Sequence, residues 1–132
     1  MLFPIESKIA PKPIGPYSQA MRMGHSLLFV SGQIALGPEG NEPLPEGIEA
    51  QTEQVMFNLS SILHQAGTDF SRVVKTSIFL QDMNDFPKVN EIYATFFTPP
   101  YPARETVAVA GLPKGALIEI SCIVSIADKP LV

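Results

Sequence analysis

The sequence is poor in the residues that disulfide, thiol and metal chemistry require, because its 132 residues include one cysteine and two histidines. The lone cysteine, Cys122, excludes an internal disulfide, which fits a reducing compartment and predicts a cytoplasmic protein. Cys122 lies in an apolar alternation, which favours inert packing over nucleophilic chemistry. His25 and His64 have no cysteine or carboxylate at ligand spacing, so we expect no metal site.

The sequence also lacks long apolar runs and concentrations of basic residues. No stretch approaches the roughly 20 apolar residues of a membrane span, and residues 1–5 are too short for a signal peptide. We therefore expect no membrane partner. The nine lysines and arginines are scattered, and the net charge is −4. This balance argues against nucleic acid as a partner, since a phosphate grip needs clustered basic residues.

Motifs for phosphate and acyl-transfer chemistry are missing as well. Gly37, Gly40 and Gly47 are punctuated by prolines and lack the order of a phosphate-binding loop. Neither Ser18 nor Ser31 lies in a nucleophile elbow. We therefore expect no cofactor, so any reaction must use positioned hydrogen bonds, one arginine and one carboxylate.

The composition that is present, with 45% hydrophobic and 17% charged residues, is typical of one globular domain, which we place at residues 1–132. Four prolines within residues 3–16 predict an extended lead-in. The later elements are predicted from apolar periodicity and from Gly and Pro punctuation. They are strands at 17–23 and 27–31, a loop at 37–47, a helix from Ile48 to the stop at Gly67, a strand at 73–80, a helix from Asn84 or Asp85 to Pro99-Pro100, and two strands within 101–120 around a Gly111–Gly115 turn.

This order of elements predicts an α+β fold, with a single, mostly antiparallel sheet and two helices packed on one face. The chain has no third helix for the other face, which therefore needs a different cover. Thr106, Ala108 and Ala110 lie on one side of their strand and are small enough for close approach by another subunit. We therefore expect a closed homo-oligomer.

Two charged residues stand where strands seldom carry them. Arg104 opens one strand, and Glu119 lies between Ile118 and Ile120 in the next. Such charges must reach solvent, a partner or a ligand, because burying them alone is costly. One interpretation is an edge arginine and a barrel-lining glutamate held by their neighbours. The other is a site for a small acid, in which Arg104 binds the carboxylate and Glu119 handles protons.

The second interpretation depends on strand register. If Ala110 pairs with Ala116, strand parity sends Arg104 and Glu119 to opposite faces of the sheet. A cleft that uses both residues then requires a one-residue offset, such as a bulge, or contributions from two subunits.

Four ordered blocks of the sequence resemble the signature of the reactive intermediate deaminase (Rid) family, and together they extend over nearly the whole chain. The blocks are Ile14-Gly15-Pro16-Tyr17-Ser18-Gln19-Ala20, then Val30-Ser31-Gly32-Gln33-Ile34, then Asn84-Asp85-Phe86 with Asn90 and Phe96-Phe97, and last Pro102-Ala103-Arg104 with Leu112-Pro113-Lys114-Gly115 and Ile118-Glu119-Ile120. The sequence departs from the archetypal enzymes at Glu105 and Thr106, where they have a small residue and then often cysteine.

The resemblance implies a chorismate-mutase-like subunit that forms a homotrimer with ligand clefts between neighbours. It also implies cofactor-free hydrolysis of 2-aminoacrylate-type enamines or imines to 2-keto acids and ammonia, so the partner is a small imine or keto acid. The site residues that it implies are Arg104, Glu119 and Tyr17 for catalysis, and Arg104, Ser31, Gly32, Thr106 and Asn90 for substrate binding, with Thr106 at one of the two positions that depart from the archetypal enzymes.

Each of these matches also has a structural interpretation. Tyr17 would hydrogen-bond across a subunit boundary, Ser31 would be a small strand residue, and Asn90 a helix-surface amide. Two other functions stay open. One is a non-catalytic trimer that senses a 2-keto acid or amino acid, with Glu105 occupying Arg104. The other is a single-stranded RNA endoribonuclease, as some relatives are described.

Overall fold

The computed structural model describes residues 1–127, so residues 128–132 of the expected domain lie outside the described part. Six strands and two α-helices occur in the order β1, β2, β3, α1, β4, α2, β5, β6. Their bounds are β1 Leu2–Ile5, β2 Ala20–Met23, β3 Leu27–Gln33, α1 Ile48–Gln65, β4 Val73–Leu80, α2 Phe86–Ala94, β5 Ala103–Ala108 and β6 Ile118–Ser125.

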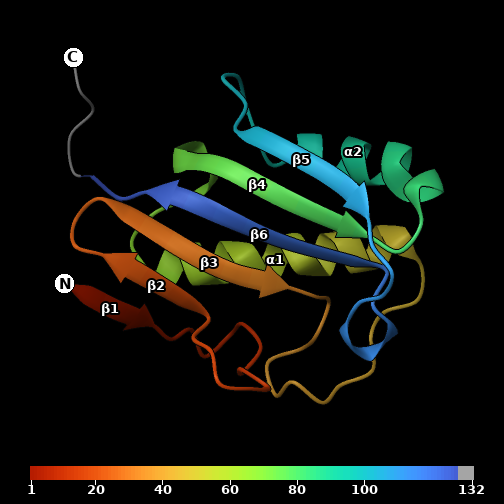
Figure 1. The fold of residues 1–132 in the computed structure, drawn as a ribbon, viewed down its shortest axis with the longest axis horizontal. Helices are drawn as coiled ribbons and strands as arrows, with labels where there is room; N and C mark the ends of the chain where they lie inside the picture. Colours follow the sequence, from red (N-terminus) through yellow and green to blue (C-terminus); the bar gives the residue numbers. More distant parts are fainter. Residues whose placement is uncertain (128–132) are drawn as a thin grey trace.

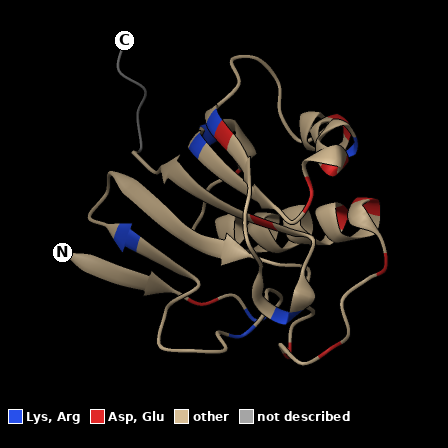
Figure 2. Cartoon of the chain, turned by 45° about the vertical axis from the view of Figure 1, so that its right-hand side comes forward, with Lys and Arg blue, Asp and Glu red and all other residues tan. Residues whose placement is uncertain are grey.

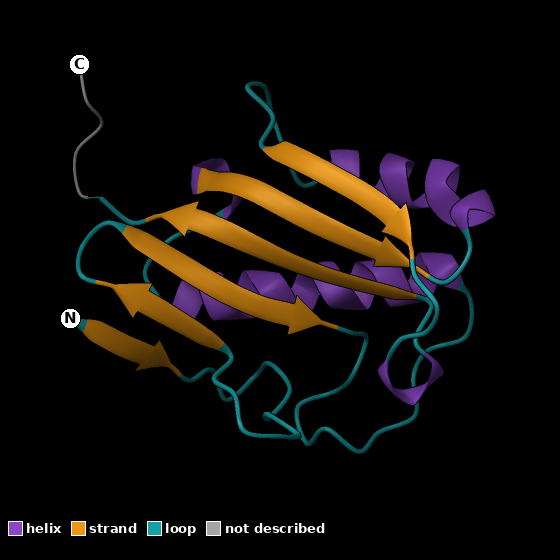
Figure 3. Ribbon diagram, viewed as in Figure 1, coloured by secondary structure: helices purple, strands orange, loops and turns teal. Residues whose placement is uncertain are grey.

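The strands form one sheet in the spatial order β1-β2-β3-β6-β4-β5. Every neighbouring pair is antiparallel except β4 and β5, which run parallel. Figures 1 and 3 show α1 and α2 on the same side of this sheet. The predicted mostly antiparallel sheet with two helices on one face is therefore confirmed.

Two parts of the strand prediction are wrong. The lead-in contains β1, which pairs with β2 at the edge of the sheet. Pro4 is tolerated there because an edge strand leaves one row of N–H groups unpaired. The strands around the glycine turn are not neighbours, since β4 lies between β5 and β6. The chain leaves β4 through α2 and returns as β5, and such a crossover connects parallel strands.

Helix α1 follows the predicted period. Val55, Leu59 and Ile62 are buried against the sheet, whereas Glu49 and Glu53 face solvent. After the helix, Gly67 takes a positive φ of 78°, and two backbone bonds, Gly67 N–H to the His64 carbonyl and Thr68 N–H to the Leu63 carbonyl, close the end. Glycine adopts this left-handed conformation without the steric cost of a Cβ, so the predicted stop is confirmed.

Helix α2 is shorter than predicted, because it ends at Ala94 rather than at the Pro99-Pro100 pair. Val89 and Tyr93 are buried as expected. Phe96 and Phe97 lie beyond the helix but still pack into the core, where both meet the ring of Phe70 edge-on at centroid distances of 5.6 and 5.3 Å. The aromatic periodicity therefore identified core positions correctly while overestimating the length of the helix.

The face of the sheet opposite the helices carries exposed apolar side chains, with Phe29 43% and Val107 45% exposed. Val107 pairs with Phe79 on this face. Thr106 pairs with Ile78, which is fully buried under the helices. Because side chains alternate along a strand, Thr106 faces the helix side. Our expectation that small residues line the open face is therefore wrong.

Cys122 on β6 points to the helix side and is 4% exposed. Burial raises the pKa of its thiol from 9.0 to about 12, which leaves about 1,000-fold less thiolate at neutral pH. Because the thiolate is the nucleophile, we expect iodoacetamide to leave folded protein unlabelled and to label Cys122 only after unfolding. Mass spectrometry of protein treated with and without guanidinium checks this. Rapid stoichiometric labelling of folded protein would contradict it.

Candidate functional site

A cavity of about 320 Å³ lies where β3 ends and β6 begins. Its polar lining comes from Lys12, Tyr17, Ser31, Gln33 and Glu119, and its apolar lining includes Ile14 and Ile34. The irregular segments before β2, after β3 and before β6 contribute to its walls. Four of the predicted site residues, Tyr17, Ser31, Gly32 and Glu119, therefore line one cavity.

The carboxyl group of Glu119 occupies the space left by the missing side chain of Gly32. A Cβ placed on Gly32 would lie 2.5 Å from Oε2 of Glu119, closer than atoms can approach. The register between β3 and β6 also shifts between Val30 and Gln33, which is the mark of a β-bulge. The Glu119 carboxyl therefore lies directly beside Gly32, the residue predicted to leave room for a ligand, and Gly32 also lines the cavity.

The Glu119 carboxyl is partly withdrawn from water, and this burial raises its pKa. Desolvation disfavours the charged form of a carboxylic acid. A carboxyl group with a raised pKa exchanges protons more readily near neutral pH than an exposed glutamate does, which suits a proton-transfer role.

Tyr17 and Ser31 present different hydrogen-bonding groups to the cavity. The Tyr17 hydroxyl accepts a bond from the Ile14 N–H at 3.3 Å, so its own proton remains available to a ligand. The Ser31 hydroxyl donates to the Ser18 carbonyl at 2.6 Å, so its oxygen remains available as an acceptor. Tyr17 therefore offers a hydrogen-bond donor to this cavity and Ser31 an acceptor.

Arg104 lies in a second hollow, which Asn90, Tyr93 and Tyr101 also line. Its Nη1 donates to Oδ1 of Asn90 at 2.8 Å. The guanidinium carbon lies 5.4 Å from the centroid of the Phe86 ring and 5.0 Å from that of Tyr93. These contacts hold the guanidinium plane in one orientation, and within residues 1–127 no carboxylate pairs with it. Two of the predicted site residues, Arg104 and Asn90, are thus hydrogen-bonded to each other.

Thr106 is two residues beyond Arg104 and faces the same side of β5. Its hydroxyl is buried and has no hydrogen-bond partner among the described residues. Buried polar atoms without partners are rare in folded proteins, because each loses its hydrogen bonds to water. Thr106 therefore lies on the same face of the sheet as Arg104 and lines neither the Arg104 hollow nor the Glu119 cavity.

Within one chain, the Arg104 hollow and the Glu119 cavity lie on opposite faces of the sheet. Glu119 pairs with Phe79, and Phe79 pairs with Val107, so these three share the open face. Arg104 pairs with Thr76, whose side chain is buried on the helix side. A bulge is present, but it lies in β3 and does not bring the two charges together. A site that uses both residues must therefore take them from two chains.

The sensing hypothesis has Glu105 occupying Arg104, but in the structure Glu105 does not contact Arg104. Its side chain is on the open face, where it forms an ion pair with Lys75 at 2.9 Å and accepts a hydrogen bond from Ser77. The bond from Ser77, followed by the contacts with Lys75, lowers the pKa of Glu105. The guanidinium of Arg104 therefore stays open to an external acid.

Sequence reasoning missed the aromatic support of Arg104. Phe86, Asn90 and Tyr93 are spaced three or four residues apart, so they lie along one face of α2. We assigned Tyr93 to the core, where it is indeed buried, and did not foresee that its ring also carries the guanidinium. The helical spacing around Asn90 was the signal that could have indicated this.

Three further observations concern metals, membranes and charge. The described residues contain no group of three or more His, Cys, Asp or Glu side chains suited to a metal ion. None of their helices has the length and apolar character needed to span a membrane. Figure 2 shows the basic residues distributed over separate strands, loops and helices.

The family model described as endoribonuclease L-PSP matches residues 7–126. The chain belongs to this family, the Rid family. The resemblance stated from the sequence is thus confirmed, and Rid-family relatives have similar sequences over most of their length. Reactive Intermediate Deaminase A, chloroplastic, from Arabidopsis thaliana is 48% identical over 92% of the chain, which spans 65% of that protein.

Two other relatives connect the Rid family to small-molecule ligands. The mouse 2-iminobutanoate/2-iminopropanoate deaminase is 45% identical over 90% of this chain and 87% of its own length. The crystal structure of E. coli TdcF with bound serine superimposes with a TM-score of 0.87 at 37% identity, and covers 93% of this chain and 98% of its own. This Rid protein therefore shares its fold with relatives named as deaminases and with one that binds an amino acid.

Proposed function

We propose that the protein is a cofactor-free hydrolase that converts small 2-imino acids, of the 2-aminoacrylate type, into 2-keto acids and ammonia. The observation that carries the proposal is the preoriented guanidinium of Arg104, which hydrogen-bonds to Asn90 and has no carboxylate partner within residues 1–127. The raised pKa of Glu119 in its cavity supports the proposal, as do the deaminases among the Rid relatives.

The active site in this proposal lies between two copies of the chain. Arg104 and Glu119 are on opposite faces of one sheet, so the Arg104 hollow of one copy must meet the Glu119 cavity of the next. Such a head-to-tail contact closes into a ring when the rotation between copies is suitable. The exposed apolar side chains of the open face, Phe29 and Val107 among them, would be covered in a homotrimer with clefts between neighbouring subunits.

In the proposed reaction, Arg104 binds the substrate carboxylate through two parallel hydrogen bonds, and Asn90 holds the guanidinium in place. Glu119 takes a proton from a water molecule, whose oxygen forms a bond to the imine carbon. Glu119 passes this proton to the imine nitrogen, which receives the electron pair of the C=N bond, and a carbinolamine results. The carbon–nitrogen bond then breaks as the carbinolamine oxygen forms the C=O bond, and Glu119 transfers the hydroxyl proton to the departing nitrogen, so the products are a 2-keto acid and ammonia.

The remaining site residues position the substrate, the attacking water and the Glu119 carboxyl. Tyr17 donates a hydrogen bond to the substrate or to the attacking water, and Ser31 accepts one. Gly32 acts indirectly, since its missing side chain gives the Glu119 carboxyl its place. Thr106 supplies a hydroxyl on the Arg104 face of the sheet.

The endoribonuclease alternative has the family description as its support. Single-stranded RNA binding ordinarily uses a basic groove with stacking aromatic side chains. The scattered basic residues and the net charge of −4 favour a small acid over RNA. RNA cleavage that is indifferent to small keto acids would support the nuclease function instead.

A complementation experiment tests the shared site. We expect an Arg104→Ala chain and a Glu119→Gln chain each to be inactive as homo-oligomers. The two variants are then unfolded and refolded together. An interface between two chains is intact when the Glu119→Gln chain supplies Arg104 and the Arg104→Ala chain supplies Glu119. Random assembly of equal amounts would restore about one quarter of wild-type imine hydrolysis. The assay measures pyruvate and ammonia released from freshly generated 2-aminoacrylate.

Sedimentation of the same mixture gives the control, since refolded material must have the assembly state of the wild type. Absence of any recovered activity in correctly assembled mixtures would refute the two-chain site. A stable monomer in the micromolar range with full wild-type activity would refute it as well.

A further inference from the structure

The loop that carries Tyr17 is closed at its base by a single side chain. We define the Tyr17 loop as residues 12–18, which lead irregularly from the lead-in segment to β2. Lys12, Ile14 and Tyr17 of this loop line the Glu119 cavity. The loop has no strand or helix of its own, so its shape depends on what holds its two ends.

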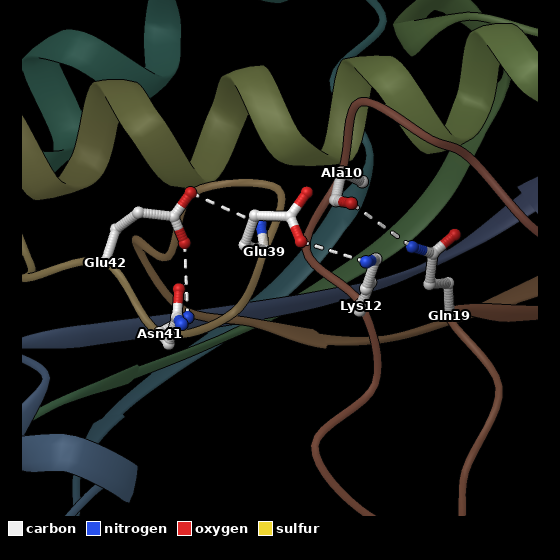
Figure 4. A network of polar contacts seen from close by, with 6 residues as sticks. All are labelled: Ala10, Lys12, Gln19, Glu39, Asn41 and Glu42. Carbon is white, nitrogen blue, oxygen red and sulfur yellow. Dashed lines mark hydrogen bonds and ion pairs between the residues drawn. The ribbon is translucent and has the colours of Figure 1, made fainter.

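Gln19 holds the first end through its side chain. Its carboxamide oxygen accepts the Ser7 N–H at 2.6 Å. Its nitrogen donates to the carbonyls of Ser7, Ala10 and Pro11 at 3.1, 3.4 and 2.8 Å. The side chain is buried, so these bonds are shielded from water and are costly to lose. Figure 4 shows the Gln19 amide reaching across to Ala10.

Gln19 holds the second end through its main chain. Its carbonyl accepts the Ser31 N–H at 2.9 Å, and the adjoining Ser18 carbonyl accepts the Ser31 hydroxyl at 2.6 Å. One residue thus joins the segment before the Tyr17 loop to the strand that carries Ser31. Inside the loop, two further bonds link Tyr17 to Gly15 and Ile14.

The other contact between this loop and its surroundings is more exposed. The Lys12 side chain forms an ion pair with Glu39 at 2.9 Å (Figure 4), with about two thirds of each side chain open to solvent. Exposed ion pairs contribute little because water and salt screen them. The Lys12 N–H also donates to the Pro38 carbonyl at 3.1 Å. The buried Gln19 amide therefore makes more hydrogen bonds to the base of the loop than any of these contacts.

We propose that Gln19 is a positioning residue of the Glu119 cavity. Its side-chain amide closes the Tyr17 loop and so sets where the Tyr17 hydroxyl stands relative to Ser31 and Glu119. The residue itself does not line the cavity. Its effect on turnover rests on the imine hydrolysis proposed above, whereas its effect on the loop does not.

The test compares Gln19→Met, which keeps length but cannot hydrogen-bond, with Thr52→Val as a matched control. Thr52 is also fully buried, donates one side-chain bond to the Ile48 carbonyl at 2.7 Å, and lies outside the cavity lining. We expect amide hydrogen exchange in residues 7–18 to accelerate by at least about tenfold in Gln19→Met while α1 keeps its protection. Thr52→Val should leave residues 7–18 unchanged.

The second measurement is the hydrolysis of 2-iminobutanoate by the same variants. We expect kcat to fall roughly 10- to 100-fold in Gln19→Met through misplacement of Tyr17. KM should stay near the wild-type value, since carboxylate binding belongs to Arg104. A uniform rise of exchange in every segment, or unchanged exchange in residues 7–18, would overturn the proposal.

Two provisions keep the outcomes distinct. If Gln19→Met does not fold, Gln19→Asn replaces it, because the shorter amide stays polar but cannot reach the Pro11 carbonyl. If the wild type hydrolyses no imine, the proposed function fails, and the exchange measurement alone decides the role of Gln19. If the wild type is active and kcat in Gln19→Met is unchanged, the positioning role is wrong and the function stands.

Discussion

Glu119→Gln is expected to lower imine hydrolysis by roughly 100-fold or more, the usual scale of general acid–base catalysis. Glutamine keeps the shape of the side chain and fits the space at Gly32, but it cannot take a proton from water. Binding of 2-ketobutyrate should persist, because the carboxylate of that ligand meets Arg104. Hydrolysis rates and calorimetric binding, measured on the same preparations, check both parts.

The pH dependence gives this prediction a second signature. Burial raises the pKa of Glu119, and a general base must be deprotonated to act. The wild-type kcat should therefore rise with pH through a pKa above the ordinary glutamate value of 4.5, and this rise should disappear in Glu119→Gln.

The raised pKa of Glu119 also determines how this residue changes the stability of the folded protein with pH. Folded protein holds the Glu119 proton more tightly than unfolded protein, so this residue favours unfolding as the pH rises through its folded pKa. Glu119→Gln should therefore be at least as stable as the wild type at neutral pH.

Glu53→Gln on the exposed face of α1 is the control and should change neither rate nor stability. Full hydrolysis in Glu119→Gln would exclude the proton-transfer role.

Arg104→Lys is expected to weaken 2-ketobutyrate binding by roughly 10- to 100-fold, the worth of about one charge-assisted hydrogen bond. Lysine keeps the charge, but it lacks the planar fork and cannot lie over the Phe86 and Tyr93 rings as the guanidinium does. Imine hydrolysis should fall at least as far. Calorimetry with 2-ketobutyrate measures the loss of affinity.

Arg22→Lys is a matched control for Arg104→Lys. Arg22 also stacks on an aromatic ring, 4.8 Å from the centroid of Phe3, but it stands on β2 away from the hollow. Its replacement should leave keto-acid binding intact. Undiminished hydrolysis in Arg104→Lys would refute the proposed mechanism but would not contradict the fold.

Local patterns in the sequence were sufficient to predict the elements that have strong apolar periodicity or clear Gly and Pro end signals. Helix α1 has a regular buried stripe and a glycine stop, and β4 is a run of β-prone residues, so both were predicted within a few positions. β1 was missed because it is a four-residue edge strand that contains a proline. Nothing local indicates that such a segment will find a partner strand.

The arrangement of the site depended on information that no local pattern contains. Arg104 and Glu119 could be selected because each charge interrupts an apolar strand. Their relative placement depended on β4 lying between β5 and β6, and strand order results from long-range pairing through α2. The role of Gly32 was also hidden, because the side chain that fills its space belongs to a strand far along the chain.

The placement of Arg104 and Glu119 on opposite faces has a kinetic consequence. If each working site needs two copies, a dissociated chain carries two halves that cannot act together. Turnover per chain then depends on total protein concentration, because dilution shifts the equilibrium toward separate chains. Activity in a dilute assay would begin low and recover as the sample is concentrated. Adding an excess of chains that lack both Arg104 and Glu119 would suppress the wild type by capturing its subunits into mixed assemblies, because such a chain completes neither of the sites that it shares with its neighbours.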